Sequence, residues 1–117
     1  VLAGGPVNVD RGFILHTNTH EPFDHSYRVN DNLMLTTSAD VVDTFGTLLE
    51  PEKYLVTLGC ASWEPHQLER EIMNNSWLVV PATEQILFDL QYDQRWLAAN
   101  QLLGIDGHNF VSQVGHC

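Results

Sequence analysis

The most informative segment of the chain reads Tyr54-Leu55-Val56-Thr57-Leu58-Gly59-Cys60-Ala61. It is almost continuously apolar, and the polar connector Pro51-Glu52-Lys53 precedes it. A short apolar run of this kind is typical of a β-strand that is covered on both faces. We therefore expect residues 54–61 to form a central strand of a sheet.

One helix is predicted before this strand in the sequence, and another is predicted after it. The first begins at about Ser38, is capped by that residue or by Thr37, and has an apolar side over residues 41–49. The second begins after Ser62, which can cap it. Pro65 fits its first turn, because the missing N–H would have no partner inside the helix there.

The first third of the chain reads as strands and turns. Gly4-Gly5-Pro6 predicts a turn, and the apolar segment Gly12–Thr17 predicts a strand. Residues 20–24 are polar and contain a proline, which indicates a loop. Tyr27–Thr37 contains two strand-like pieces around Asn30-Asp31-Asn32, and these side chains favour a hairpin turn.

The last third of the chain is predicted to contain a short strand followed by helical segments. Trp77–Val80 predicts a short strand that Pro81 stops, and residues 83–89 predict a short helix or turn. A helix is expected over about Asp93–Leu103, followed by Gly104 as its left-handed C-terminal residue. The three tryptophans of the chain have apolar neighbours and are expected to anchor the core: Trp63, Trp77 and Trp96.

This order of elements predicts the fold class. It implies an α/β domain, close to α+β, with a mixed and largely antiparallel sheet and helices packed on it. The length of 117 residues indicates a single domain over 1–117, large enough to bury about two-thirds of its unfolded surface. No run of about 18 apolar residues is present, so the sequence predicts no membrane span.

The charge balance bears on partners. The chain has 5 Lys+Arg and 15 Asp+Glu, giving a formal net charge of −10. Duplex DNA is usually bound through a basic face, because counterion release supplies much of the affinity. Direct nucleic-acid binding is therefore disfavoured, unless the five cations Arg11, Arg28, Lys53, Arg70 and Arg95 were to cluster.

The two cysteines and the first residues of the chain bear on the cellular compartment of the protein. Cys60 lies in an apolar run and Cys117 is the last residue, so both are predicted to be free thiols in a reducing cytoplasm. The chain opens at Val1 without the charged and apolar regions of a signal peptide. We expect it to be part of a longer protein.

The histidines, Ser62 and Cys60 are the residues of the chain that could carry metal or catalytic chemistry. His16, His20 and His25 stand close together, but the spacing of His16 and His20 fits only half of the usual zinc pattern and no CxxC or HExxH motif accompanies it, so surface or loop histidines are favoured. Ser62 is better explained as a helix cap than as a nucleophile, and Cys60 as a buried thiol. The sequence thus predicts no catalytic residues, no metal and no cofactor.

One candidate ligand site remains open. The turn containing Gly4 and Gly5 could present backbone N–H groups to an anion, and Arg11 could add its guanidinium. His16 stands at the far end of the Gly12–Thr17 strand. We take these four residues as candidate ligand-binding residues, with turn-building as the alternative reading.

A series of motifs along the whole chain resembles the AlgH/YqgE family of bacterial proteins. The motifs are individually common and jointly specific: Gly4-Gly5-Pro6, Arg11-Gly12-Phe13-Ile14-Leu15-His16, Thr37-Ser38-Ala39-Asp40-Val41, Leu58-Gly59-Cys60-Ala61-Ser62-Trp63, Gln67-Leu68-Glu69, Trp77-Leu78, Ile86-Leu87-Phe88, Arg95-Trp96, Leu103-Gly104-Ile105-Asp106 and Gly115-His116. The resemblance implies an α/β fold, a chain covering about 60% of the family's length, and about 70 further N-terminal residues.

The resemblance implies little about function. Family members are described as transcriptional regulators by association with alginate control, and no catalytic residues carry over. The leading hypothesis is a cytoplasmic regulatory or interaction protein that affects transcription indirectly, through a protein partner or a small ligand. The alternative is a ligand-binding domain or enzyme with a pocket near Gly4–Pro6 and Arg11–His16. A homo-oligomer is compatible with both.

Overall fold

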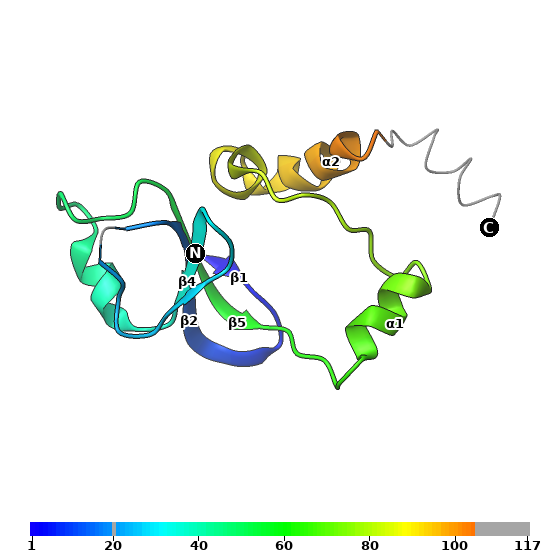
Figure 1. The fold of residues 1–117 in the computed structure, drawn as a ribbon, viewed down its shortest axis with the longest axis horizontal. Coiled ribbons are helices and arrows are strands. Elements are labelled where there is room, and N and C mark those ends of the chain that lie inside the picture. Colours follow the sequence, from blue (N-terminus) through cyan, green and yellow to red (C-terminus); the bar gives the residue numbers. More distant parts are fainter. Residues whose placement is uncertain (20, 105–117) are drawn as a thin grey trace. The chain divides into compact units, whose positions relative to one another are not determined.

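The computed structural model describes residues 1–19 and 21–104, and the chain forms two compact units (Figure 1). The first unit is Val1–Trp63 and contains the sheet. The second unit begins at Glu64 and contains two α-helices. That the whole chain is one domain stays a prediction.

The first unit is built on one five-stranded sheet with the order β1-β5-β2-β4-β3. β1 pairs with β5 in parallel, and the other neighbouring strands are antiparallel. This confirms the predicted mixed, largely antiparallel sheet. The strands are β1 (Leu2–Ala3), β2 (Val7–Thr17), β3 (Ser26–Arg28), β4 (Leu33–Thr36) and β5 (Tyr54–Cys60).

β2 holds the sheet together because it pairs with β5 on one side and with β4 on the other. Its second half makes both pairings: Ile14 stands opposite Val56 and Thr36. The strand begins at Val7, earlier than the predicted Gly12, and its pairing register with β5 shifts between these two residues. The exposed, mostly polar residues in between gave no strong strand signal.

The predicted hairpin is confirmed between β3 and β4, where Ser26 stands opposite Thr36 and Arg28 opposite Met34. Asn30 organises the turn. Its side-chain oxygen accepts the backbone N–H groups of Asn32 at 2.8 Å and Leu33 at 2.9 Å. An asparagine side chain that accepts hydrogen bonds from the backbone N–H groups ahead of it gives these groups partners that the turn would otherwise lack.

The core of the first unit is small. Ile14, Leu33 and Val41 are its buried apolar side chains, at 4%, 5% and 0% exposure. Val41 comes from η1 (Ala39–Thr44), a 3₁₀ helix, whereas the sequence predicted a longer helix. The hydroxyl of Thr44 donates to the carbonyl of Val41, and Gly46 takes a left-handed φ of 80°, so the helix cannot continue as predicted.

β5 lies inside the sheet, as predicted, with β1 and β2 as neighbours. The expectation that both of its faces are covered is not met in the described residues. Tyr54 is 38% exposed and Leu58 is 43% exposed. A continuous apolar run does not by itself distinguish a strand buried on both faces from one with a partly open face.

The second unit contains α1 (Gln67–Met73), η2 (Gln85–Asp89) and α2 (Tyr92–Leu102). The predicted start of α1 near Ser62 is wrong. His66 precedes the helix with a left-handed φ of 67°, which a residue inside a right-handed helix cannot have. The side chain of Gln67 instead accepts the N–H of Glu64 at 2.9 Å.

Some of the later predictions for this unit are confirmed and others are wrong. η2 and α2 confirm the predicted helical segments, and Gly104 has the expected left-handed φ of 70°. Residues 77–80 form no strand. The three tryptophans are not buried anchors in the described chain: Trp63, Trp77 and Trp96 are 37%, 50% and 77% exposed. The indole N–H of Trp77 donates to the carboxylate of Glu71 at 3.1 Å, a polar contact that an apolar anchor would not need.

Candidate functional site

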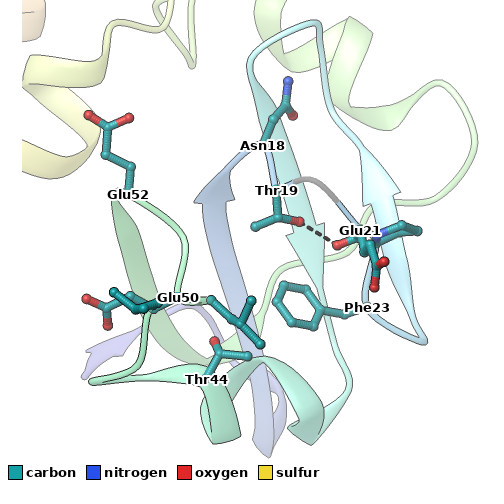
Figure 2. A pocket seen from close by; sticks show the side chains of 10 residues that line it. Asn18, Thr19, Glu21, Phe23, Thr44, Glu50 and Glu52 are labelled. Atoms are coloured by element: carbon teal, nitrogen blue, oxygen red, sulfur yellow. Dashed lines mark hydrogen bonds between the residues drawn. The ribbon is translucent and has the colours of Figure 1, made fainter.

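A cavity of about 690 Å³ lies in the first unit beside the end of β2 (Figure 2). We call it the acidic pocket. One wall comes from the segment between β2 and β3 and consists of Asn18, Thr19, Glu21, Pro22 and Phe23. The volume lies within the range of about 300–1,000 Å³ that is usual for ligand sites.

The second wall comes from the end of η1 and the connector that leads into β5. It consists of Thr44, Leu48, Leu49, Glu50 and Glu52. The two leucines are exposed, at 104% for Leu48 and 74% for Leu49. The pocket therefore combines apolar surface that is open to solvent with three carboxylates.

Hydrogen bonds fix the first wall. The hydroxyl of Thr19 donates to the carbonyl of Glu21 at 2.7 Å (Figure 2). The side-chain amide of Asn18 donates to the carbonyl of Asp31 in the hairpin turn. The backbone N–H of Phe23 donates to the hydroxyl of Ser26 at 3.1 Å. These contacts tie the wall to β3 and to the turn that follows it.

A buried chain of hydrogen bonds lies behind Phe23. Nδ1 of His16 is 2.7 Å from the carbonyl of Thr17, which can only accept, so Nδ1 carries the proton. In the neutral ring, Nε2 then accepts the hydroxyl of Thr36 at 2.7 Å. The hydroxyl of Ser26 therefore donates to Thr36 at 2.6 Å. His16 and Thr36 are both fully buried.

His16 also contacts the pocket wall itself. Its ring meets the ring of Phe23 edge to face, with 5.5 Å between the centroids and 81° between the planes. This arrangement is the favoured one for aromatic pairs. The orientation of Phe23 in the pocket thus rests on a buried polar network.

The second wall is anchored as well. The backbone N–H of Gly46 donates to the carboxylate of Glu50 at 2.9 Å. Pro51 is buried, and the connector meets the end of β2 where the N–H of Thr17 donates to the carbonyl of Lys53 at 3.0 Å. Both walls are therefore tied, directly or through His16, to the same end of β2.

Among the described residues that line the pocket, all charged side chains are acidic. Glu21, Glu50 and Glu52 line it, and no Lys, Arg or described His does so. Glu21 lies on one side of the opening, and Glu50 and Glu52 lie on the other (Figure 2). The carboxylates are spread around the rim instead of converging on one point.

A fourth carboxylate supports the structure near the pocket. Asp40, at the start of η1, accepts the hydroxyl of Ser38 and the backbone N–H of Asp24, the latter at 2.9 Å. The Ser38 hydroxyl, followed by the Asp24 N–H, lowers the pKa of Asp40 below its ordinary value of about 3.8. The carboxylate form of Asp40 is therefore the form that the fold favours.

The four candidate residues from the sequence are not brought together on one open cleft. The N–H of Gly4 donates to the carbonyl of Leu58 at 2.7 Å, so it is used within the sheet. His16 stands opposite Tyr54, four residues away from Leu58 along β5, which is about 13 Å. His16 is moreover buried with both ring nitrogens bonded, which corrects the expectation of a surface or loop histidine.

Gly4 and Gly5 have a structural role at this end of the sheet. A Cβ on Gly4 would lie 2.2 Å from the carbonyl oxygen of Gly59, and one on Gly5 would lie 2.4 Å from the carbonyl carbon of Cys60. There is likewise no room for a side chain at position 59, because a Cβ added to Gly59 would lie 2.4 Å from the carbonyl oxygen of Gly5. Two backbones can approach this closely only where side chains are absent.

Arg11 alone of the four lines an open hollow. This hollow of about 550 Å³ is formed by Pro6, Asn8, Val9, Asp10 and Arg11. The guanidinium carbon of Arg11 lies 5.6 Å from the ring centroid of Phe13, within reach of a cation–π interaction. The neighbouring Asp10 places a negative charge on the same hollow.

Other reactive groups form no site in the described part of the chain. Among the described residues, no group of three or more His, Cys, Asp and Glu could hold a metal ion. Cys60 is a free thiol and only half-buried, which corrects the expectation of a buried one. Ser62 lies outside α1 and does not cap it. Within residues 1–19 and 21–104, no helix is long and apolar enough to cross a membrane.

Sequence reasoning missed the acidic pocket. Leu48 and Leu49 were assigned to the apolar side of a helix that does not extend so far. The nearest signal was their position between Gly46 and the acidic residues Glu50 and Glu52, since exposed leucines beside carboxylates are unusual for a buried helix face. Nothing local connected this segment to Phe23.

The fold is that of a mixed α/β protein, and its first unit carries an acidic, partly apolar pocket. The AlgH-like family model matches residues 1–108, and the chain belongs to this family. It is 68% identical over 117 residues to a UPF0301 protein of Pasteurella multocida and 62% identical to one of Mannheimia succiniciproducens, each match covering 100% of this chain. The chain spans 63% of the length of both relatives.

A solved structure agrees. The solution structure of the AlgH protein from Pseudomonas aeruginosa matches with a TM-score of 0.75 and 41% identity, covering 89% of this chain and 54% of that one. These findings confirm the resemblance seen in the sequence and its mixed α/β fold. They also agree with a chain of about 60% of the family's length. None of these names states an activity.

Proposed function

We propose that the chain is a non-catalytic, cytoplasmic interaction protein that acts through a protein partner. Any effect on transcription is then indirect, through that partner. The regulatory role is proposed because members of the family are described as regulators. The mode of action is proposed from the surface of the first unit.

The observation that carries the proposal is the acidic pocket. Leu48 and Leu49 expose most or all of their side chains beside Glu50 and Glu52. Exposed apolar residues rimmed by polar ones are typical of a surface that another protein covers.

The distribution of cations argues against a direct contact with DNA. Arg11 lies on β2 and Arg28 on the edge strand β3, with β4 between them. In the second unit, Arg95 donates to the carbonyl of Leu90 at 3.2 Å and so is partly used within its own chain. The chain carries 15 acidic residues against 5 Lys+Arg, and this excess of negative charge would repel phosphates.

The test is site-specific photo-crosslinking in the bacterial cell. A benzophenone amino acid replaces Leu48 in the full-length protein, and a matched control carries it at Met73 on α1, which is 81% exposed. We expect a discrete crosslinked polypeptide from position 48 and none of that mass from position 73. Crosslinks to nucleic acid, or equal products from both positions, would contradict the proposal.

A small-ligand site at the Gly4–Pro6 turn is the second candidate, as the alternative to an interaction protein. Arg11 and Pro6 line an open hollow there, which is the observation in its favour. The test is a titration with inorganic phosphate. Saturable binding that Arg11→Gln abolishes would support this function, and no binding would eliminate it for phosphate.

A further inference from the structure

We propose that the acidic pocket binds a basic, apolar peptide segment of the partner, with two separated Lys or Arg residues flanking apolar side chains. This inference rests on the proposed function and specifies the chemistry of its partner. Both walls of the pocket belong to the first unit.

The charge of the pocket selects a cationic occupant. Three glutamates are among the residues that line it, and no described cationic residue is. A neutral apolar ligand would remove water from these carboxylates without replacing their hydrogen bonds, which is unfavourable. An ammonium or guanidinium group would supply both the opposite charge and the hydrogen-bond donors.

The position of the carboxylates selects separated cations. Glu21 lies across the opening from Glu50 and Glu52 (Figure 2). The three glutamates therefore do not converge on a single cation. This placement also agrees with the finding that no set of described residues could hold a metal ion.

The apolar surface selects a peptide over a free polyamine. The ring of Phe23 forms part of the pocket, and Leu48 and Leu49 extend the apolar surface outward into solvent. The stems of Lys and Arg pack on apolar surface while their charged ends reach polar groups. Apolar side chains between the two cations would in addition cover the leucines, which a simple diamine leaves exposed.

The experiment is a titration of the isotopically labelled full-length protein, followed by NMR. The probe is the peptide acetyl-Lys-Leu-Phe-Leu-Lys-amide. One comparison peptide has both lysines acetylated on Nζ, which removes only the charges, and 1,5-diaminopentane serves as the small-molecule comparison. We expect saturable shifts at Asn18–Thr19, Glu21–Phe23 and Leu48–Glu52, and at least tenfold weaker binding of the acetylated peptide.

Matched variants locate the site. The double variant Glu21→Lys/Glu52→Lys reverses one charge on each side of the opening and leaves Glu50 in place, because Glu50 accepts the N–H of Gly46. We expect at least tenfold weaker binding of the lysine peptide. Glu69→Lys, on the exposed side of α1, is the control and should change the affinity less than threefold.

Several outcomes would overturn the inference. These are equal binding of the acetylated peptide, equal binding of the diamine, shifts outside the acidic pocket, or an equal loss in the Glu69 variant. If crosslinking from position 48 captures a polypeptide and the lysine peptide does not bind, the proposed function stands and this inference fails. If neither occurs, both fail.

Discussion

Three glycines let the start of the chain lie directly against the end of β5. Gly5 has a φ of 148° and Gly59 a φ of 80°, conformations that other residues rarely adopt. Each would place a Cβ 2.4 Å from the backbone of the facing segment. Glycine is therefore required here for the close approach of the two backbones within the sheet.

Gly5→Ala should destabilise the protein by more than about 2 kcal/mol, because both a steric clash and backbone strain are introduced. Gly12→Ala is the matched control: its Cβ would meet nothing within 4 Å. It should change the free energy of unfolding by less than about 1 kcal/mol. Urea denaturation of the full-length variants measures both values, and equal losses would contradict the account of Gly5.

Thr36 is the central member of the buried network behind Phe23. Thr36→Val leaves Nε2 of His16 without a donor and the hydroxyl of Ser26 without its acceptor, so we expect a loss of about 1–3 kcal/mol. Thr36→Ser keeps the hydroxyl and should cost less. A valine variant as stable as the serine variant in urea would show that the network does not contribute.

His16 illustrates what the sequence could not reveal at this scale. The half of β2 that contains His16 was predicted as a strand, and strand alternation alone places a side chain on one face or the other. The burial of His16 depends on Thr36 and Phe23, which follow it in the chain by 20 and 7 positions and meet it only in the folded sheet. No local pattern encodes that meeting.

At the level of the elements, η1 is held at its start by Asp40. The pKa of Asp40 is lowered by the Ser38 hydroxyl first and by the Asp24 N–H second. A carboxyl group with a lower pKa in the folded state adds stability above its ordinary pKa of about 3.8, and this contribution is lost as the pH falls through the folded-state value.

Asp40→Asn should therefore flatten the dependence of stability on pH in the acid range, below about pH 4. Ser38→Ala removes the largest cause of the shift and should reproduce part of that change. The measurement is the urea midpoint of each full-length variant from pH 6 to pH 2.5. A variant curve parallel to that of the wild type over this range would contradict the assignment.

The elements differ in how well they could be predicted. The β3–β4 hairpin was found because Asn30 and its neighbours form the turn locally. The helix predicted from Ser38 was too long, because the contact of Thr44 with Val41 and the left-handed Gly46 outweigh the apolar spacing. The acidic pocket was missed because its two walls lie more than 20 residues apart in the sequence.

At the scale of the molecule, the net charge of −10 that these 117 residues carry makes a prediction about nucleic acid. The purified full-length protein should bind duplex DNA at physiological salt more weakly than the usual non-specific limit of about 10⁻⁴ M. Fluorescence anisotropy with labelled genomic fragments measures this. A sequence-specific complex that weakens steeply with added salt would contradict the indirect mode of action.

The most direct test of the central claim is native mass spectrometry of the full-length protein, purified gently from its bacterial host without added metal or ligand. Wild-type protein and the Glu21→Lys/Glu52→Lys variant are compared, and the spectra also give the number of copies in each assembly. The account predicts a co-purifying polypeptide on the wild type that is absent from the variant. A reproducible small-molecule mass lost on denaturation, or a polypeptide retained equally by both proteins, would contradict it.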